Sequence, residues 1–63
     1  MIKKLINSEW QTFSGLKDVK KGDIFKCVEP FGEGPIMQAR EDARQTEKNG
    51  RVVWSVRAPK VKL

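Results

Sequence analysis

The sequence contains no histidine and a single cysteine, Cys27. One cysteine cannot form a disulfide within the chain, and a zinc site made of cysteine and histidine is excluded. The serines have no histidine to activate them, so a serine–histidine catalytic pair is excluded as well. We therefore expect no cofactor and no metal. We interpret Cys27 as a small buried residue of a protein from a reducing compartment, the cytoplasm.

Long apolar runs are also missing. None approaches the roughly 20 residues that a membrane-spanning helix requires, and Asn7 ends the short apolar start too early for a signal sequence. A chain of 63 residues forms one domain, residues 1–63, with a thin core. Such a core leaves no room for the apolar pocket that a small molecule needs, so we expect neither a membrane partner nor a small-molecule substrate.

The carboxylates are not spaced for catalysis. Asp23 and Glu29 fall on one predicted strand, about 20 Å apart by strand rise, which is too far to act on one bond. Glu41 and Asp42 are adjacent in a predicted helix and point apart. We therefore expect that the protein is not an enzyme and has no catalytic residue.

Positive charge is what the sequence does have. It contains 13 lysines and arginines against 8 acidic residues, a net charge of +5. From Arg51 to the C-terminus every charged residue is basic, and a second basic group surrounds Gly22. A polyanion is a natural partner for such a surface, although basic surface also favours solubility and acidic protein partners.

Hydrophobic patterning predicts strands over residues 1–6, 23–29, 36–38, 51–57 and, as a basic tail or an edge strand, 60–63. Apolar residues fall on both faces of the second of these strands, as is typical of a strand between two layers or in a small curled barrel. We expect Phe25 and Trp54 to be needed in the core.

The segment after the first strand favours a short helix. Ser8 and Gln11 have the spacing of a capping box, which predicts a helix over 9–14 that ends at Gly15. The apolar residues of 1–13 also fit one amphipathic helix, so strand and helix both stay open for residues 1–6.

A second helix is predicted over 39–48, because this segment consists almost wholly of good helix formers. Asn49-Gly50 fits two interpretations: the end of that helix, or a hairpin turn between a strand at 44–48 and the strand that follows. The weak strand character of 44–48 favours the helix end. The predicted fold is therefore α+β and β-rich: a small SH3-like barrel or a twisted antiparallel sheet with one or two short helices. The alternative is an open α+β sheet with the 39–48 helix on one face.

The basic turn and the strand after it carry a resemblance. Within Leu16–Phe25, we expect Gly22 to adopt a positive φ that lets the chain reverse, and Asp23 to cap the turn. Glu29-Pro30, Asp42-Ala43 and Val53–Val56 follow. This layout resembles that of small uncharacterised proteins encoded by bacteriophages and prophages, over roughly two-thirds of the chain. The resemblance implies a phage accessory protein in the cytoplasm of a bacterial host, and it carries no catalytic residues.

The main hypothesis is a nucleic-acid partner, DNA or RNA, bound through a basic face. Lysines near residue 20 and arginines of the last strand form one stripe if these two segments are neighbours, and outward aromatic rings would stack on bases. The candidate binding residues are Lys17, Lys20, Lys21, Lys26, Arg51, Arg57, Lys60, Lys62, Trp10 and Phe31.

The alternative hypothesis is a protein-binding module that docks on a host protein and modulates or inhibits it. A sheet edge at 60–63 or 36–38 would pair with a strand of the partner, and Phe31 and Met37 would supply apolar anchors. In either case we expect a monomer or a weak homodimer.

Overall fold

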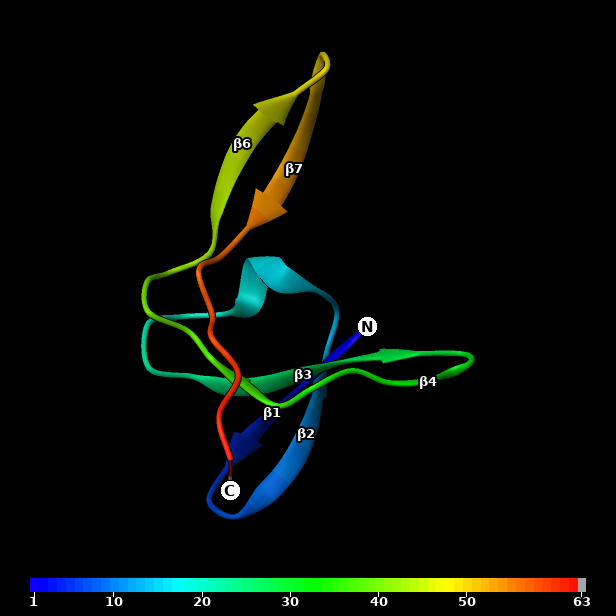
Figure 1. The fold of residues 1–63 in the computed structure, drawn as a ribbon, viewed down its shortest axis with the longest axis vertical. Helices are drawn as coiled ribbons and strands as arrows, with labels where there is room; N and C mark the ends of the chain where they lie inside the picture. Colours follow the sequence, from blue (N-terminus) through cyan, green and yellow to red (C-terminus); the bar gives the residue numbers. More distant parts are fainter. Residues whose placement is uncertain (63) are drawn as a thin grey trace.

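The computed structural model describes residues 1–62, which form antiparallel strands in two sheets (Figure 1). The larger sheet has the order β2-β1-β3-β4, with β5 also paired to β3, and β6 and β7 form a separate hairpin. The elements are β1 (Ile2–Ile6), β2 (Glu9–Phe13), the short 3-10 helix η1 (Leu16–Asp18), β3 (Ile24–Glu29), β4 (Gly32–Glu33), β5 (Met37–Gln38), β6 (Arg44–Lys48) and β7 (Arg51–Ser55). The prediction of a strand-rich antiparallel fold is confirmed. The sheets do not close, so a barrel is not observed.

The helix predicted over 9–14 is absent, and residues Glu9–Phe13 form the strand β2 instead. Asn7 and Ser8 have φ angles of 51° and 66°, which is the geometry of a two-residue hairpin turn and not of a helix N-cap. The turn pairs β1 with β2, from Ile6 opposite Glu9 to Ile2 opposite Phe13. A helix of six residues is marginal on its own, whereas the hairpin gives the backbone of this segment hydrogen-bonding partners on β1.

The predicted helix over 39–48 is also absent. Asn49 (φ 52°) and Gly50 (φ 77°) form the hairpin turn that was the second interpretation, and β6 pairs with β7 from Lys48 opposite Arg51. Backbone hydrogen bonds join residues 39–43 to other segments of the chain. The Ala43 amide, for example, donates to the Val19 carbonyl at 2.9 Å. Long-range backbone pairing therefore overrides helix propensity here.

The core lies on one face of the larger sheet. Ile2, Val19, Phe25, Ala39 and Ala43 are buried. Half-buried apolar residues pack around them: Phe13, Leu16, Cys27, Met37, Val56 and Ala58. The prediction for Phe25 is confirmed.

The prediction that Trp54 lies in the core is wrong. Trp54 is 39% exposed, because the β6–β7 hairpin projects beyond the core (Figure 1). The core contact of this part of the chain is made at Val56, just after β7.

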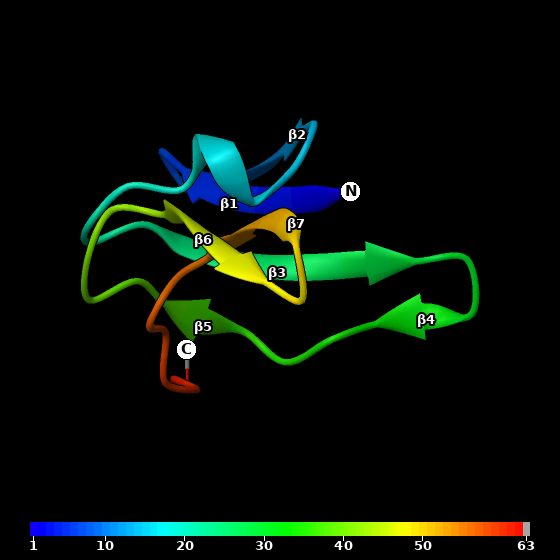
Figure 2. The same cartoon turned by 90° about the horizontal axis from the view of Figure 1, so that it is seen from above.

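The C-terminal segment lies beside β5. The Arg40 amide donates to the Arg57 carbonyl at 2.8 Å, and Lys60 forms a bridge with Met37. Figure 2 shows β5 on one side of β3 and β1 on the other. The predicted edge at 60–63 is thus paired at Lys60, while Leu63 lies outside the described residues. The segment 36–38 is not the open edge that the protein-binding hypothesis assumed, since it has neighbours on both sides.

Candidate nucleic-acid interface

The turn that carries Lys20 and Lys21 is held by its own hydrogen bonds. The Lys20 amide donates to Asp23 Oδ2 at 2.8 Å, and the Asp23 amide donates to the Lys20 carbonyl at 3.0 Å. Gly22 has the predicted positive φ, 91°. Val19 is fully buried just before the turn, so the two lysines that follow it are fixed at the surface, where both are exposed.

A buried lysine balances the acid of this turn. Lys4 extends from the core face of β1, and its Nζ lies 3.1 Å from Asp23 Oδ2 and 2.6 Å from the Asp18 carbonyl oxygen. The ammonium also lies 4.2 Å from the centroid of the Phe13 ring, in cation–π geometry. Lys4 offsets the negative charge of Asp23. This carboxylate therefore does not cancel the positive charge of the two exposed lysines in the turn.

Backbone hydrogen bonds bring two arginines next to this turn. The Gly22 amide donates to the Ala39 carbonyl at 2.8 Å, and the Arg40 amide donates to the Arg57 carbonyl, also at 2.8 Å. The turn, residues 39–40 and residue 57 thus lie side by side. We call the exposed side chains of Lys20, Lys21, Arg40 and Arg57 the basic corner.

The basic corner keeps most of its charge. Within residues 1–62, ion pairs join Lys4 to Asp23, Lys26 to Glu33 and Arg44 to Glu41, and none includes a side chain of the corner. Three acids lie close by. Asp23 is paired with Lys4, and Glu41 lies 3.8 Å from Arg44. The Asp42 carboxylate accepts a hydrogen bond from the Lys21 amide at 2.8 Å. The local balance is therefore still positive. Sequence reasoning missed Arg40, because it assigned this residue to a helix.

Lys26 and Trp10 belong to a different surface. Lys26 Nζ lies 2.9 Å from Glu33 Oε2 and 4.3 Å from the centroid of the Trp10 ring. The hydrogen bond from Lys26, and then its charge, lower the pKa of Glu33 from its ordinary value of 4.5. Lys26 is therefore already paired, and it covers part of the half-buried Trp10 ring.

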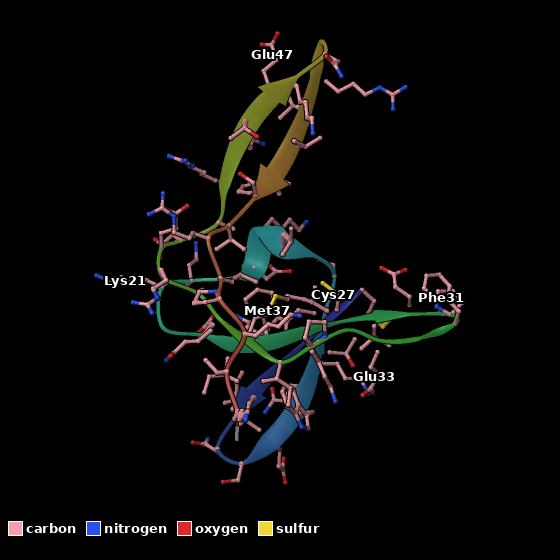
Figure 3. All side chains as sticks on the ribbon, viewed as in Figure 1. Lys21, Cys27, Phe31, Glu33, Met37 and Glu47 are labelled. Carbon is pink, nitrogen blue, oxygen red and sulfur yellow. The ribbon has the colours of Figure 1, made fainter. Side chains whose placement is uncertain are left out.

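The other predicted residues lie apart from the corner. Phe31 is 91% exposed in the turn between β3 and β4, at the opposite end of the molecule from Lys21 (Figure 3). Lys17 is exposed on η1, where Ser14 donates a hydrogen bond to Asp18 at 2.9 Å and this bond lowers the Asp18 pKa. Arg51 starts β7 at the end of its hairpin. Lys60 and Lys62 are exposed on the C-terminal segment. The corner thus unites three of the ten predicted residues.

Comparison with known proteins gives no further assignment: no family model, no curated protein and no solved structure matches the chain. Among the described residues, no helix is long and apolar enough to cross a membrane. Residues 1–62 also hold no group of three or more histidine, cysteine, aspartate or glutamate side chains placed to bind a metal ion.

Proposed function

We propose that this protein is a non-catalytic accessory or regulatory protein that binds nucleic acid through the basic corner. The observation that carries the proposal is that backbone hydrogen bonds bring three separate segments side by side, and these segments carry the exposed residues Lys20, Lys21, Arg40 and Arg57. Lysine and arginine side chains that are exposed and not held by acids neutralise phosphates and release the counterions condensed on nucleic acid.

The number of basic side chains in the corner sets the expected salt dependence of binding. If its four side chains each neutralise one phosphate of a duplex, the slope of log K against log salt is about −3.6. Raising the salt from 50 to 200 mM would then weaken binding roughly 100-fold. A low-salt assay is therefore the sensitive one.

Fluorescence anisotropy with labelled duplex and single-stranded DNA and RNA, at about 50 mM salt, tests the proposal. The wild-type protein should bind at least one of them, and changing Lys20, Lys21 and Arg57 together to glutamate should abolish binding. A comparison variant with the same change in charge, Lys17, Lys60 and Lys62 to glutamate, should lose less affinity. The proposal fails if the wild type binds no nucleic acid at low salt, or if the comparison variant loses as much as the corner variant.

A protein partner is the second candidate, and the exposure of Phe31 favours it. An aromatic ring that is 91% exposed at the end of a hairpin is an available anchor for a partner. In a nuclease-treated bacterial lysate, the wild type would then retain a stoichiometric protein that Phe31→Ser loses and the corner variant keeps. If Phe31→Ser retains the same proteins as the wild type, this candidate is excluded.

A phage or prophage origin and a location in the bacterial cytoplasm are part of the proposal. Their support is the resemblance of Leu16–Phe25 and the segments after it to small bacteriophage proteins. A phage accessory protein acts inside the infected cell, where nucleic acid is an abundant polyanion.

A further inference from the structure

The β6–β7 hairpin separates its charges between two faces. Cross-strand partners lie on the same face of a hairpin, and successive residues alternate between faces. One face therefore carries Arg44, Lys48 and Arg51 with Thr46, Val53 and Ser55; we call it the ribbon face. The opposite face carries Gln45, Glu47, Val52 and Trp54. All three basic side chains of the hairpin thus lie on one face, and its acid lies on the other.

Most of this hairpin is exposed, although η1 contacts β7. It forms a two-stranded sheet of its own and projects from the rest of the chain, with Val53 38% exposed at the centre of the ribbon face (Figure 1). A two-stranded hairpin on its own is marginally stable in water, so a bound partner would stabilise it. Arg44 Nε lies 3.8 Å from Glu41 Oε2, a long and exposed contact that contributes little and leaves this arginine available.

We propose that the hairpin is a ribbon that inserts its ribbon face into the major groove of B-form duplex DNA. This inference rests on the proposed nucleic-acid function and names its ligand. The major groove is about 12 Å wide and admits a two-stranded ribbon. Lys48 and Arg51 lie at the end of the hairpin and Arg44 lies four residues back, about 13 Å along the strand. Positive charge at both ends of the ribbon matches the phosphates that border a groove of this width.

The middle of the ribbon face suits base edges. Thr46 and Val53 are cross-strand partners between the charged ends. A threonine hydroxyl hydrogen-bonds to base edges, and methyl groups contact the methyl group of thymine. The hairpin also joins the basic corner, since Arg40 precedes β6 by four residues and Arg57 follows β7 by two. The corner then supplies contacts to the DNA backbone beside the inserted hairpin.

The shape of the groove distinguishes DNA from RNA. Double-stranded RNA has a deep, narrow major groove that side chains cannot read. The wild type should therefore bind a DNA duplex of about 16 base pairs at least tenfold more tightly than an RNA duplex of the same sequence and than either single strand.

Two neighbouring valines allow a matched test of the face. Val53→Glu places a carboxylate on the ribbon face, whereas Val52→Glu places the same group on the opposite face. Both side chains are exposed and both variants have the same net charge. Val53→Glu should weaken DNA-duplex binding at least tenfold, and Val52→Glu no more than about threefold. NMR spectra of β6 and β7 verify that the hairpin persists. Should Val53→Glu disturb it, changing Arg44, Lys48 and Arg51 to glutamine replaces that variant, with the same tenfold loss expected.

The outcomes separate this inference from the proposed function. If no nucleic acid binds at low salt, the proposed function itself fails. If nucleic acid binds but DNA and RNA duplexes bind equally, the inference alone is overturned. It is also overturned if Val52→Glu and Val53→Glu weaken binding equally, or if the glutamine variant binds DNA as the wild type does.

Discussion

Lys4 and Asp23 form an ion pair between β1 and the turn that precedes β3, with 3.1 Å between Nζ and Oδ2. The Asp23 carboxylate also accepts a hydrogen bond from the Lys20 amide. One carboxylate therefore connects the core face of the sheet to the turn that carries the exposed lysines. The Lys4 side chain is only 11% exposed. The position of the basic corner therefore depends on a residue that is itself largely buried.

Replacing Lys4 should destabilise the protein. Lys4→Met keeps the length of the side chain but leaves Asp23 and the Asp18 carbonyl without the ammonium. Loss of one partner of a buried pair costs about 3–5 kcal/mol, and the cost is lower here because the Asp23 side chain is 29% exposed. Lys3→Met is the control, since Lys3 lies on the opposite face of β1 and is half-buried. Urea unfolding measures both variants. Equal midpoints for the two would show that the buried pair contributes no stability.

Stability should fall in acid through the contact between Lys26 and Glu33. The pKa of Glu33 is lower in the folded chain than its ordinary value of 4.5, because Lys26 donates a hydrogen bond to it. The stabilisation is therefore present above about pH 4.5 and is lost as the pH falls through the folded-state pKa. Glu33→Gln should unfold at lower urea than the wild type at pH 6.5, and the difference should shrink at pH 3. In a Lys26→Met background, Glu33→Gln should have a smaller pH-dependent effect, because of the two lysines only Lys3 then lowers the pKa of Glu33.

Gly50 should be required for the β6–β7 hairpin. Its φ of 77° lies in the left-handed region, where a side chain costs about 1–2 kcal/mol. Gly50→Ala should therefore speed amide hydrogen exchange in β6 and β7 roughly 5- to 30-fold. Gly15 is the matched control, because it is extended and an added Cβ meets no atom within 4 Å. Unchanged exchange in Gly50→Ala would contradict the assigned turn.

Four observed strands, β1, β3, β5 and β7, lie within the predicted ranges. Three of them, β1, β3 and β7, contain β-branched or aromatic residues, which favour strands. Residues 9–13 of the first predicted helix and residues 44–48 of the second are strands, because a positive-φ turn beside each one supplies a pairing partner. Asn49-Gly50 carries the signal of a hairpin turn, but the helix propensity of residues 44–48 favours the other interpretation, a helix end. At Asn7-Ser8 the capping-box spacing was misleading, since Ser8 has a φ of 66°.

The same error hid part of the candidate site. Treating 39–48 as a helix places Arg40, Arg44 and Lys48 on one helix face, because they are four residues apart, but it gives no reason to place Arg51 beside them. In the hairpin, strand alternation and cross-strand pairing put Arg44 and Lys48 on the face of Arg51. Arg40 joins the corner through a hydrogen bond to Arg57, a contact between distant segments that propensity does not report. The predicted lysines of the turn were identifiable because Gly22-Asp23 fixes that turn locally.

The salt dependence of DNA binding should show how many arginines of the basic corner contact phosphates. If Arg40 and Arg57 each neutralise one phosphate, changing both to glutamine should reduce the slope of log K against log salt by about 1.8. Lys26→Gln is the comparison. The Lys26 ammonium is already 2.9 Å from the Glu33 carboxylate, so its loss removes less charge available to phosphate. Fluorescence anisotropy titrations between about 50 and 200 mM salt measure both slopes. If Lys26→Gln reduces the slope as much as the double arginine change, the face that contacts phosphate includes the outer side of the sheet and is not centred on the corner.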